Sequence, residues 1–149
     1  MAAVQETGLF GQPMRWYVDQ AARPFIGLAL AFLVGYIGSY WLEVSYLEVV
    51  APLVLVAQLV AAVVTAYLTG VHGGASLTQT ILVCLLVGGS GGAISAILAF
   101  IRFFYPWLLL NLVTEPVWSG LIAGCLGAVT IGFFKLPKLI KREQMSNNN

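Results

Sequence analysis

The sequence predicts an all-α integral membrane protein with four transmembrane helices, short loops and both ends in the cytoplasm. Three observations lead to this fold class. The chain is 60% hydrophobic and only 9% charged, it contains four apolar runs that are long enough to cross a bilayer, and its basic residues gather near its two ends. Its 149 residues are expected to form a single membrane domain.

Each predicted span is an apolar run without Lys, Arg, Asp or Glu. A bilayer core roughly 30 Å thick is crossed by about 20 helical residues, because a helix rises about 1.5 Å per residue. The runs cover residues 24–42, 49–68, 77–101 and 117–134. The first run is too long for a signal-peptide core and has no small-residue cleavage site after it, so we expect it to be retained.

Prolines support these boundaries. Pro24, Pro52 and Pro116 stand at or near the first turn of a predicted span. A missing backbone N–H costs little at that position, because it would have no partner within the helix. Pro137 is expected to end the last span for the opposite reason, since a proline removes a donor from the helix interior.

Basic residues in the short flanking segments predict the orientation. Arg15 and Arg23 precede the first span. Four more follow the last span: Lys135, Lys138, Lys141 and Arg142. Cytoplasmic loops carry an excess of Lys and Arg, so both ends are expected inside, with 135–149 as a basic cytoplasmic tail. Arg102 in the third loop opposes this pattern, but its long side chain can reach the interface from a helix end.

Two flanking segments are expected to lie at the membrane surface. Residues 13–23 place Arg15 and Asp19 one helical turn apart beside apolar residues, which favours a short interfacial helix. Residues 103–115 are apolar enough either to lie along the surface or to dip into the bilayer as a short re-entrant element.

Glycine is the strongest local signal. Helix-packing candidates at small-xxx-small spacing are Gly35, Gly88, Gly92, Gly120 and Gly124. Lipid is as apolar as leucine, so membrane helices associate through close backbone packing at such residues. The faces could pack the four helices together, bind a second copy or a partner, or, at residues 88–92, unwind the third span to expose carbonyl groups to an ion.

The remaining candidates are isolated polar residues. Gln58, Ser90 and Asn111 are the polar intramembrane candidates, each able either to satisfy a neighbouring helix or to line a pore. His72 is a low-probability ligand for a haem or a metal, because no second ligand stands at helical spacing from it. We therefore expect no catalytic residue, no metal site and no cofactor.

These features favour contact surfaces over chemistry. The predicted spans lack ionisable residues and Glu115 is assigned to a loop, which excludes proton pumps and ion-coupled carriers, and the sequence has no nucleophile–base pattern typical of an enzyme. With a net charge of +1, nucleic-acid binding is not expected. The leading hypothesis is an accessory or scaffold subunit of a bacterial-type inner or plasma membrane. It would contact lipids and form a homo-oligomer or join a larger complex, and the alternative is an oligomeric passive channel or small-solute facilitator.

Overall fold

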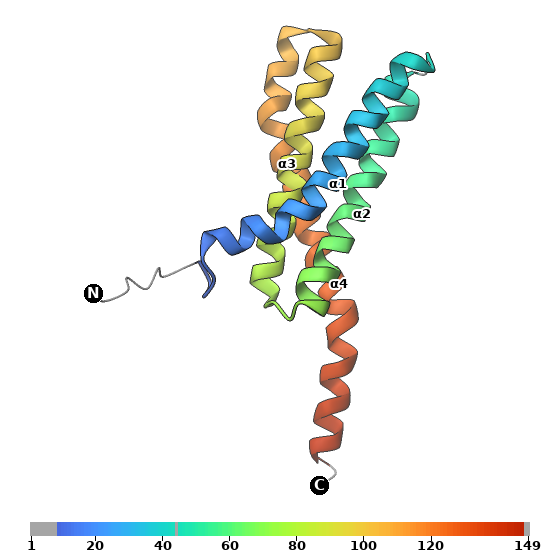
Figure 1. Ribbon diagram of the computed structural model, residues 1–149. Coiled ribbons are helices and arrows are strands. Elements are labelled where there is room, and N and C mark those ends of the chain that lie inside the picture. The colour runs from blue at the N-terminus through green and yellow to red at the C-terminus, as the bar shows by residue number, and fades with distance from the viewer. Residues whose placement is uncertain (1–8, 44, 148–149) are drawn as a thin grey trace, which may run out of the picture.

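The computed structural model describes the backbone of residues 9–43 and 45–147, and the side chains of these residues apart from 46, 47 and 136–147. Every regular element in this part of the chain is a helix (Figure 1). Four helices are long and apolar enough to cross a membrane: Met14–Trp41, Glu48–His72, Leu77–Phe103 and Pro106–Lys135. The predicted all-α chain with four such helices is confirmed, and it is consistent with a multi-pass membrane protein.

The first helix, α1, runs from Met14 to Trp41 and includes the predicted interfacial segment 13–23 apart from its first residue. Pro24 lies inside the helix and not at its first turn. An interior proline removes one backbone N–H donor and bends a helix, and Figure 1 shows the first turns of α1 running across the other helices before α1 turns along them. The segment is therefore the opening part of α1.

The second spanning helix consists of three consecutive helical segments. They are the π-helical η1 (Tyr46–Val50), the α-helix α2 (Ala51–Ala66) and the π-helical η2 (Tyr67–His72). Pro52 falls in the first turn of α2, as its position in the sequence predicts. Near the change to π-helix, the Thr65 and Thr69 hydroxyls donate to carbonyls one turn earlier, which satisfies them inside an apolar helix.

The third helix, α3, runs without a break from Leu77 to Phe103. Its start is fixed by a capping box: the Gln79 backbone N–H donates to Ser76 Oγ at 3.2 Å, and the Ser76 N–H donates to Gln79 Oε1 at 2.9 Å. Phe104 follows with a left-handed backbone conformation (φ 51°) that ends the helix. The alternative in which residues 88–92 unwind is wrong, because this glycine-rich segment keeps its helical hydrogen bonds.

The fourth helix begins earlier than the sequence predicts. A 3₁₀ segment, η3 (Pro106–Leu110), leads directly into α4 (Asn111–Asn147). Residues 103–115 are thus mostly the opening of this helix and not a separate surface or re-entrant element. Pro116 lies within α4 and not at its first turn, and the backbone stays helical beyond Pro137, so both expected boundaries are wrong. In the predicted basic tail, the side chains after residue 135 lie outside the described residues.

Helices α3 and α4 pack backbone against backbone. A Cβ atom on Gly88 would lie 2.5 Å from the Ser119 carbonyl oxygen, and one on Gly92 would lie 2.6 Å from the Glu115 carbonyl oxygen. From the other side, a Cβ on Gly120 would come within 3.3 Å of the Leu85 carbonyl oxygen. The distances at Gly88 and Gly92 leave no room for a side chain, so glycine at these two positions is what allows the helices to touch.

Helices α1 and α2 pack on α3 through two buried clusters. Tyr17, Leu28 and Phe32 of α1 contact Val83 and Val87 of α3 in the first cluster. The second cluster joins α2, α3 and α4 through small side chains, which are Ala62, Ala66, Cys84 and Ala123. Both clusters lie toward the end of the bundle where α3 begins. Toward the other end, the α1–α2 pair and the α3–α4 pair diverge (Figure 1).

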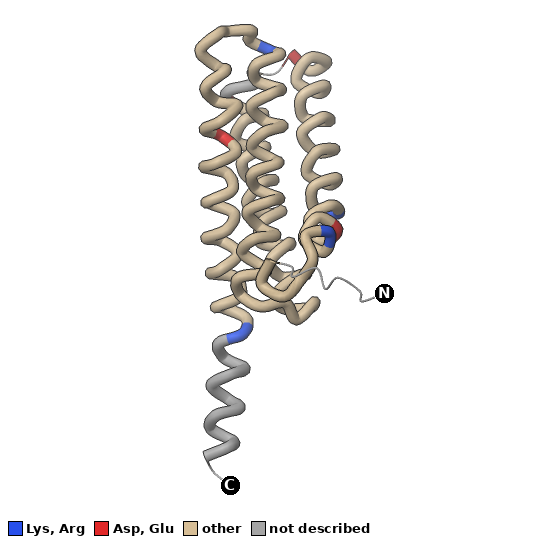
Figure 2. Tube along the Cα trace, turned by 90° about the vertical axis from the view of Figure 1, so that its left-hand side faces the viewer, with Lys and Arg blue, Asp and Glu red and all other residues tan. Residues whose placement is uncertain are grey.

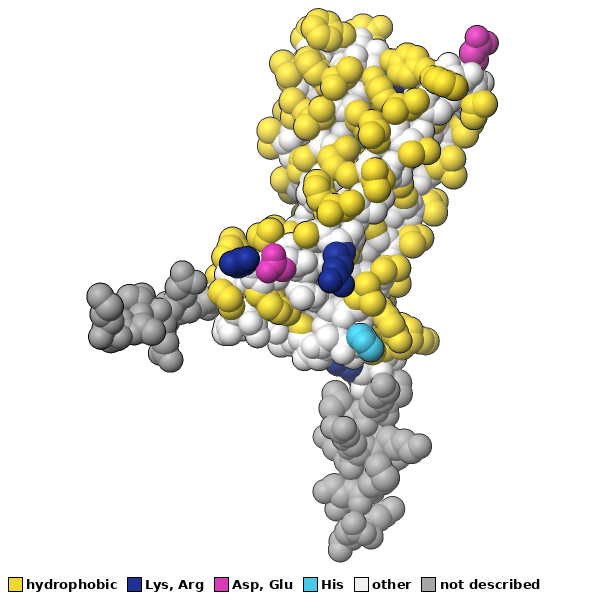
Figure 3. All heavy atoms as spheres, viewed as in Figure 1, with side chains coloured by type: hydrophobic (Ala, Val, Ile, Leu, Met, Phe, Trp, Pro, Cys, Tyr) yellow, Lys and Arg dark blue, Asp and Glu magenta, His cyan; other side chains and the backbone are white. Residues whose placement is uncertain are grey.

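Polar contacts tie the helices together at both ends of the bundle. Where α1 and α3 end, Arg102 Nη1 donates to Ser39 Oγ at 2.6 Å, and the guanidinium lies 4.3 Å from the centroid of the Tyr40 ring. At the opposite end, Lys135 Nζ donates to the Ala75 carbonyl at 2.9 Å. Figure 2 shows charged positions mostly toward these ends, and Figure 3 shows hydrophobic side chains covering the surface between them. Such a surface is suited to lipid.

The Gly88→Ala variant is expected to lower the free energy of unfolding by about 1–3 kcal/mol, because the added methyl group overlaps the α4 backbone. The control is Gly132→Ala in α4, where a Cβ meets nothing within 4 Å. Denaturant titration of both variants in mixed micelles measures the difference. Equal stabilities would contradict the close α3–α4 contact.

Candidate functional site

Glu115 is an acidic residue within a spanning helix. The sequence places it in a loop, because it interrupts the apolar run before residue 117. In the structure it lies in the second turn of α4, within the span Pro106–Lys135, and its side chain is half-buried. The expectation that the spans lack ionisable residues is therefore wrong. The physical reason is that η3 and the first turns of α4 extend the helix past this carboxylate.

The depth of Glu115 follows from its partner on α3. Its carbonyl oxygen faces Gly92, and α3 has 27 residues, so α3 is about 40 Å long and Gly92 lies about 16 Å from its end. A hydrocarbon core of about 30 Å centred on α3 leaves about 5 Å outside each face. Glu115 then lies about 11 Å below one surface of this core.

The Glu115 carboxylate has polar neighbours but no charge partner in the described part of the chain. The Ser95 hydroxyl on α3 hydrogen-bonds to it, and Asn111 Nδ2 lies 3.5 Å from Oε1 one turn earlier in α4. No described Lys, Arg or His lies within ion-pair distance of it; the described ion pair joins Arg15 and Asp19. An acidic group at membrane depth costs about 3 kcal/mol when unpaired, so such residues usually serve a function.

Glu115 lines a cleft between α2 and the α3–α4 pair, which we call the polar cleft. Its outer part has a volume of about 500 Å³ and its middle part about 270 Å³. Ala51, Val54, Ser95 and Glu115 line both parts. The outer wall adds the following residues: Ala99, Phe103, Tyr105, Trp107, Leu108 and Asn111. The middle part adds Leu55, Gln58, Thr114, Trp118, Ser119 and Ile122.

The polar cleft narrows with depth and ends in the core. Beyond Gln58, the volume of the cleft falls to about 30 Å³, and this deepest part lies between α2 and α4. Below this point lies the cluster of small side chains, in which Ala62, Ala66, Cys84 and Ala123 are at most 4% exposed. These side chains close the cleft at the end where α3 begins. A solute can therefore reach Glu115 and Gln58 from the end where α3 ends, or from the side between α2 and α4, where Leu55 and Trp118 are exposed.

Two of the three polar intramembrane candidates meet in the polar cleft. Gln58 lines its middle part and Asn111 its outer part, on either side of Glu115. Ser90 is not among the residues that line it. Its hydroxyl donates to the Leu86 and Val87 carbonyls of its own helix, at 2.7 and 3.0 Å. The sequence did not single out Glu115 or Ser119 as site residues, although Glu115 stands out as the one acidic residue between Arg102 and Lys135.

The other sequence candidates lie away from the polar cleft. Gly88 and Gly92 lie against Ser119 of α4, and Gly120 and Gly124 lie against Leu85 of α3. A Cβ atom on Gly35 of α1 would lie 3.6 Å from the Val50 side chain. His72 is exposed at the end of η2. Among the described residues, no group of three or more His, Cys, Asp or Glu side chains could hold a metal ion.

The sequence matches no protein-family model, no curated protein and no solved structure. Function must therefore be argued from the geometry of the polar cleft. Its acidic group, two amides and hydroxyls form a polar surface inside an otherwise apolar bundle, and such convergent polar groups in a cavity are typical of a ligand site.

Cysteine labelling tests whether water reaches the polar cleft. In a Cys84→Ala/Cys125→Ala background, Asn111→Cys and Gln58→Cys are expected to react at least about tenfold faster with a water-soluble thiosulfonate than Val56→Cys, because only a hydrated thiol ionises. Val56 lies on the same helix as Gln58 and is 54% exposed on the outer surface. Similar rates at all three positions would contradict a hydrated cleft.

Proposed function

We propose that this chain is a membrane facilitator that binds a small cationic solute in the polar cleft and helps it to cross the bilayer. The observation that carries the proposal is Glu115, a carboxylate at membrane depth without a charge partner among the described residues, in a cleft that is closed at the end where α3 begins. This proposal takes up the alternative that the sequence left open, with Glu115 added to Gln58 and Asn111 and with Ser90 removed.

Charge supports a cationic solute. An unpaired carboxylate in a low-dielectric cleft attracts a positive charge more strongly than it would in water. The Gln58 and Asn111 amides and the Ser95 hydroxyl can rotate their dipoles toward a bound cation, as polar residues that line a pore do. None of the described basic side chains lines the cleft to repel it.

The distribution of basic residues supports a cytoplasmic position for both ends. Arg15, Arg23 and Lys135 belong to the end of the bundle where α1 and α3 begin, and the sequence places three more basic residues after Lys135. Arg102 at the other end is held by Ser39 and Tyr40. With this orientation in a bacterial-type plasma membrane, the polar cleft opens toward the outside.

Flux into liposomes tests the proposal. Reconstituted protein is expected to speed the entry of tetraethylammonium, a cation that crosses lipid slowly, whereas glycerol entry stays as in protein-free liposomes. Glu115→Gln removes the negative charge of the cleft. It is expected to lower the rate of cation entry by about tenfold or more, because the cation loses a desolvated charge partner. Glu48→Gln, a change at an exposed acidic residue, is the matched control. Entry no faster than in protein-free liposomes would refute the proposed function.

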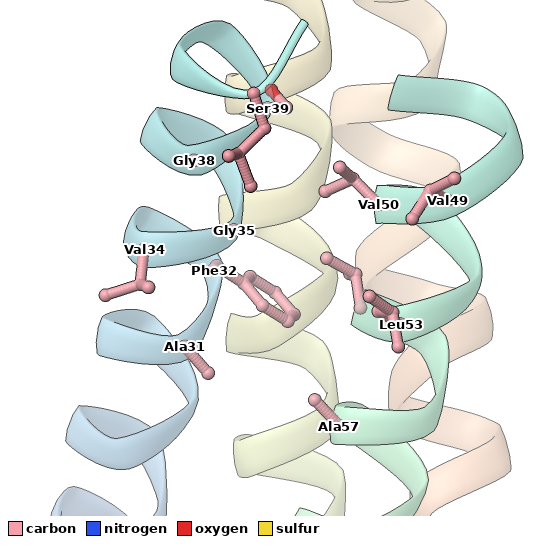
Figure 4. A pocket seen from close by; sticks show the side chains of 12 residues that line it. Ala31, Phe32, Val34, Gly35, Gly38, Ser39, Val49, Val50, Leu53 and Ala57 are labelled. Atoms are coloured by element: carbon pink, nitrogen blue, oxygen red, sulfur yellow. The ribbon is translucent and has the colours of Figure 1, made fainter. Parts of the chain in front are cut away.

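An accessory or scaffold subunit remains the second candidate, and one observation favours it. Between α1 and α2 lies an apolar groove of about 510 Å³, with Gly35 and Gly38 on one wall and Val50 and Leu53 on the other (Figure 4). A Cβ on Gly38 would meet nothing within 4 Å. Unlike the glycines between α3 and α4, this small-residue face is open to a neighbouring helix, from a second copy or from a larger membrane complex.

Native mass measurement tests this second candidate. If a neighbouring helix packs at Gly38, the wild-type chain is expected to leave gentle detergent as a defined oligomer or with a stoichiometric partner. Gly38→Leu should then release the single chain, because the added side chain fills the contact surface. Gly132→Leu, at another glycine without neighbours, serves as the control. A wild-type chain that is monomeric and alone would contradict the scaffold role.

A further inference from the structure

We infer that the polar cleft selects an amphiphilic organic cation, a ligand with one positive charge on an aromatic or alkyl body, in preference to an inorganic ion or a lipid headgroup. This inference rests on the proposed function for its transport step, but the binding site itself is argued from the cleft. Three features of the cleft favour such a ligand: its charge, its aromatic wall and its size.

The charge of the cleft matches a single positive group. Glu115 is the one carboxylate among the residues that line it, and its described polar contacts come from the neutral Ser95 and Asn111. A monovalent cation beside Glu115 leaves the site neutral, which lowers the cost of holding both charges at membrane depth. A second positive charge would have no partner there.

The wall above Glu115 is aromatic. Phe103, Tyr105 and Trp107 line the same outer cavity as the carboxylate. The Tyr105 and Trp107 rings stack with centroids 6.0 Å apart and planes 12° from parallel. Aromatic faces attract organic cations through their quadrupoles and also cover apolar groups, so this wall suits a ligand that carries both.

The size of the cleft argues against a bare metal ion. An outer cavity of about 500 Å³ is in the range of pockets that hold drug-sized ligands. A small cation needs about six or more oxygen ligands at short distances, as Ca²⁺ does, and among the described residues no acidic cluster of three or more could supply them. A bulky ligand instead fills the space between the apolar walls.

A zwitterionic lipid headgroup fits the cleft poorly. A lipid amine could reach Glu115, but its phosphate would need a cationic or strongly donating partner. No described basic residue lines the cleft, and the Arg102 guanidinium is bound to Ser39 and stacked on Tyr40. The unpaired phosphate would remain an uncompensated charge, so the cleft favours a cation without an anionic group.

Two probes of matched shape and opposite charge test the inference. The purified full chain in phosphatidylcholine nanodiscs is titrated with tetraphenylphosphonium and, separately, with tetraphenylborate, and binding is followed by equilibrium dialysis against empty nanodiscs. Saturable binding of the phosphonium alone is expected. Equal binding of the two ions would show partition into apolar surface only and would overturn the inference.

Variants locate the bound cation. Glu115→Gln is expected to weaken phosphonium binding by about tenfold or more, and Glu115→Asp to restore most of it, because a desolvated charge pair is lost and then regained. Trp107→Leu is expected to weaken binding about threefold through loss of its ring face. Glu48→Gln is the control. Unchanged affinity in Glu115→Gln and in Trp107→Leu, each shown to be folded by its unfolding temperature, would overturn the inference.

The outcomes separate this inference from the proposed function. Phosphonium binding that depends on Glu115 without any tetraethylammonium flux supports the site and refutes the facilitator. Flux of tetraethylammonium without saturable phosphonium binding supports the facilitator and overturns the inferred preference for a large amphiphilic cation. Loss of phosphonium binding when phosphatidylethanolamine replaces phosphatidylcholine would mean that a lipid amine occupies Glu115, which also overturns the inference.

Discussion

The backbone contact between α3 and α4 determines where the polar residues of these two helices lie, because Gly88 and Gly92 fix which residues of α4 stand opposite them. Lipid offers no hydrophobic driving force between helices, so they are held by close van der Waals contact. Gly88 and Gly92 provide it and also set the register, because Ser119 and Glu115 must lie opposite them. That register brings the Glu115 carboxylate beside Ser95 and deep in the membrane. A shift of two turns toward the α3 end, about 11 Å, would move it near the headgroups, where an acidic residue needs no function.

The sequence predicts the four helices well because apolar length is a direct consequence of bilayer thickness. The start of α4 is predicted too late. Glu115 and Pro116 interrupt the apolar run in the sequence, but neither residue stops this helix. The candidate site was foreseen in part: Gln58 and Asn111 stand out by polarity alone. Which way a residue faces depends on packing between distant segments. Ser90, with its hydroxyl bonded within α3, could not be separated from Gln58 by composition.

Small residues serve two different purposes in this chain, which the shared spacing of the glycines conceals. On α3 and α4, Gly88, Gly92, Gly120 and Gly124 contact the facing helix, so these four glycines are not available to a partner. On α1, Gly35 and Gly38 border an open apolar groove (Figure 4). A lipid chain or a neighbouring helix can fill that groove, whereas the polar cleft offers hydrogen-bonding groups that lipid tails cannot use. The two cavities therefore favour different partners, and the roles that we propose for them do not exclude each other.

A facilitator whose cleft is closed at one end must reach a second state in which that end opens. In this fold the seal consists of Ala62, Ala66, Cys84 and Ala123, small side chains that bury little area each. Because helices in lipid are held by van der Waals contact over the touching area, separating such small side chains costs less than separating large ones. The α1–α2 pair already diverges from α3–α4 above the seal. Rocking of one pair against the other would then close the upper opening as the seal parts. A cation beside Glu115 neutralises the cleft during this motion, which makes the occupied protein the easier one to convert.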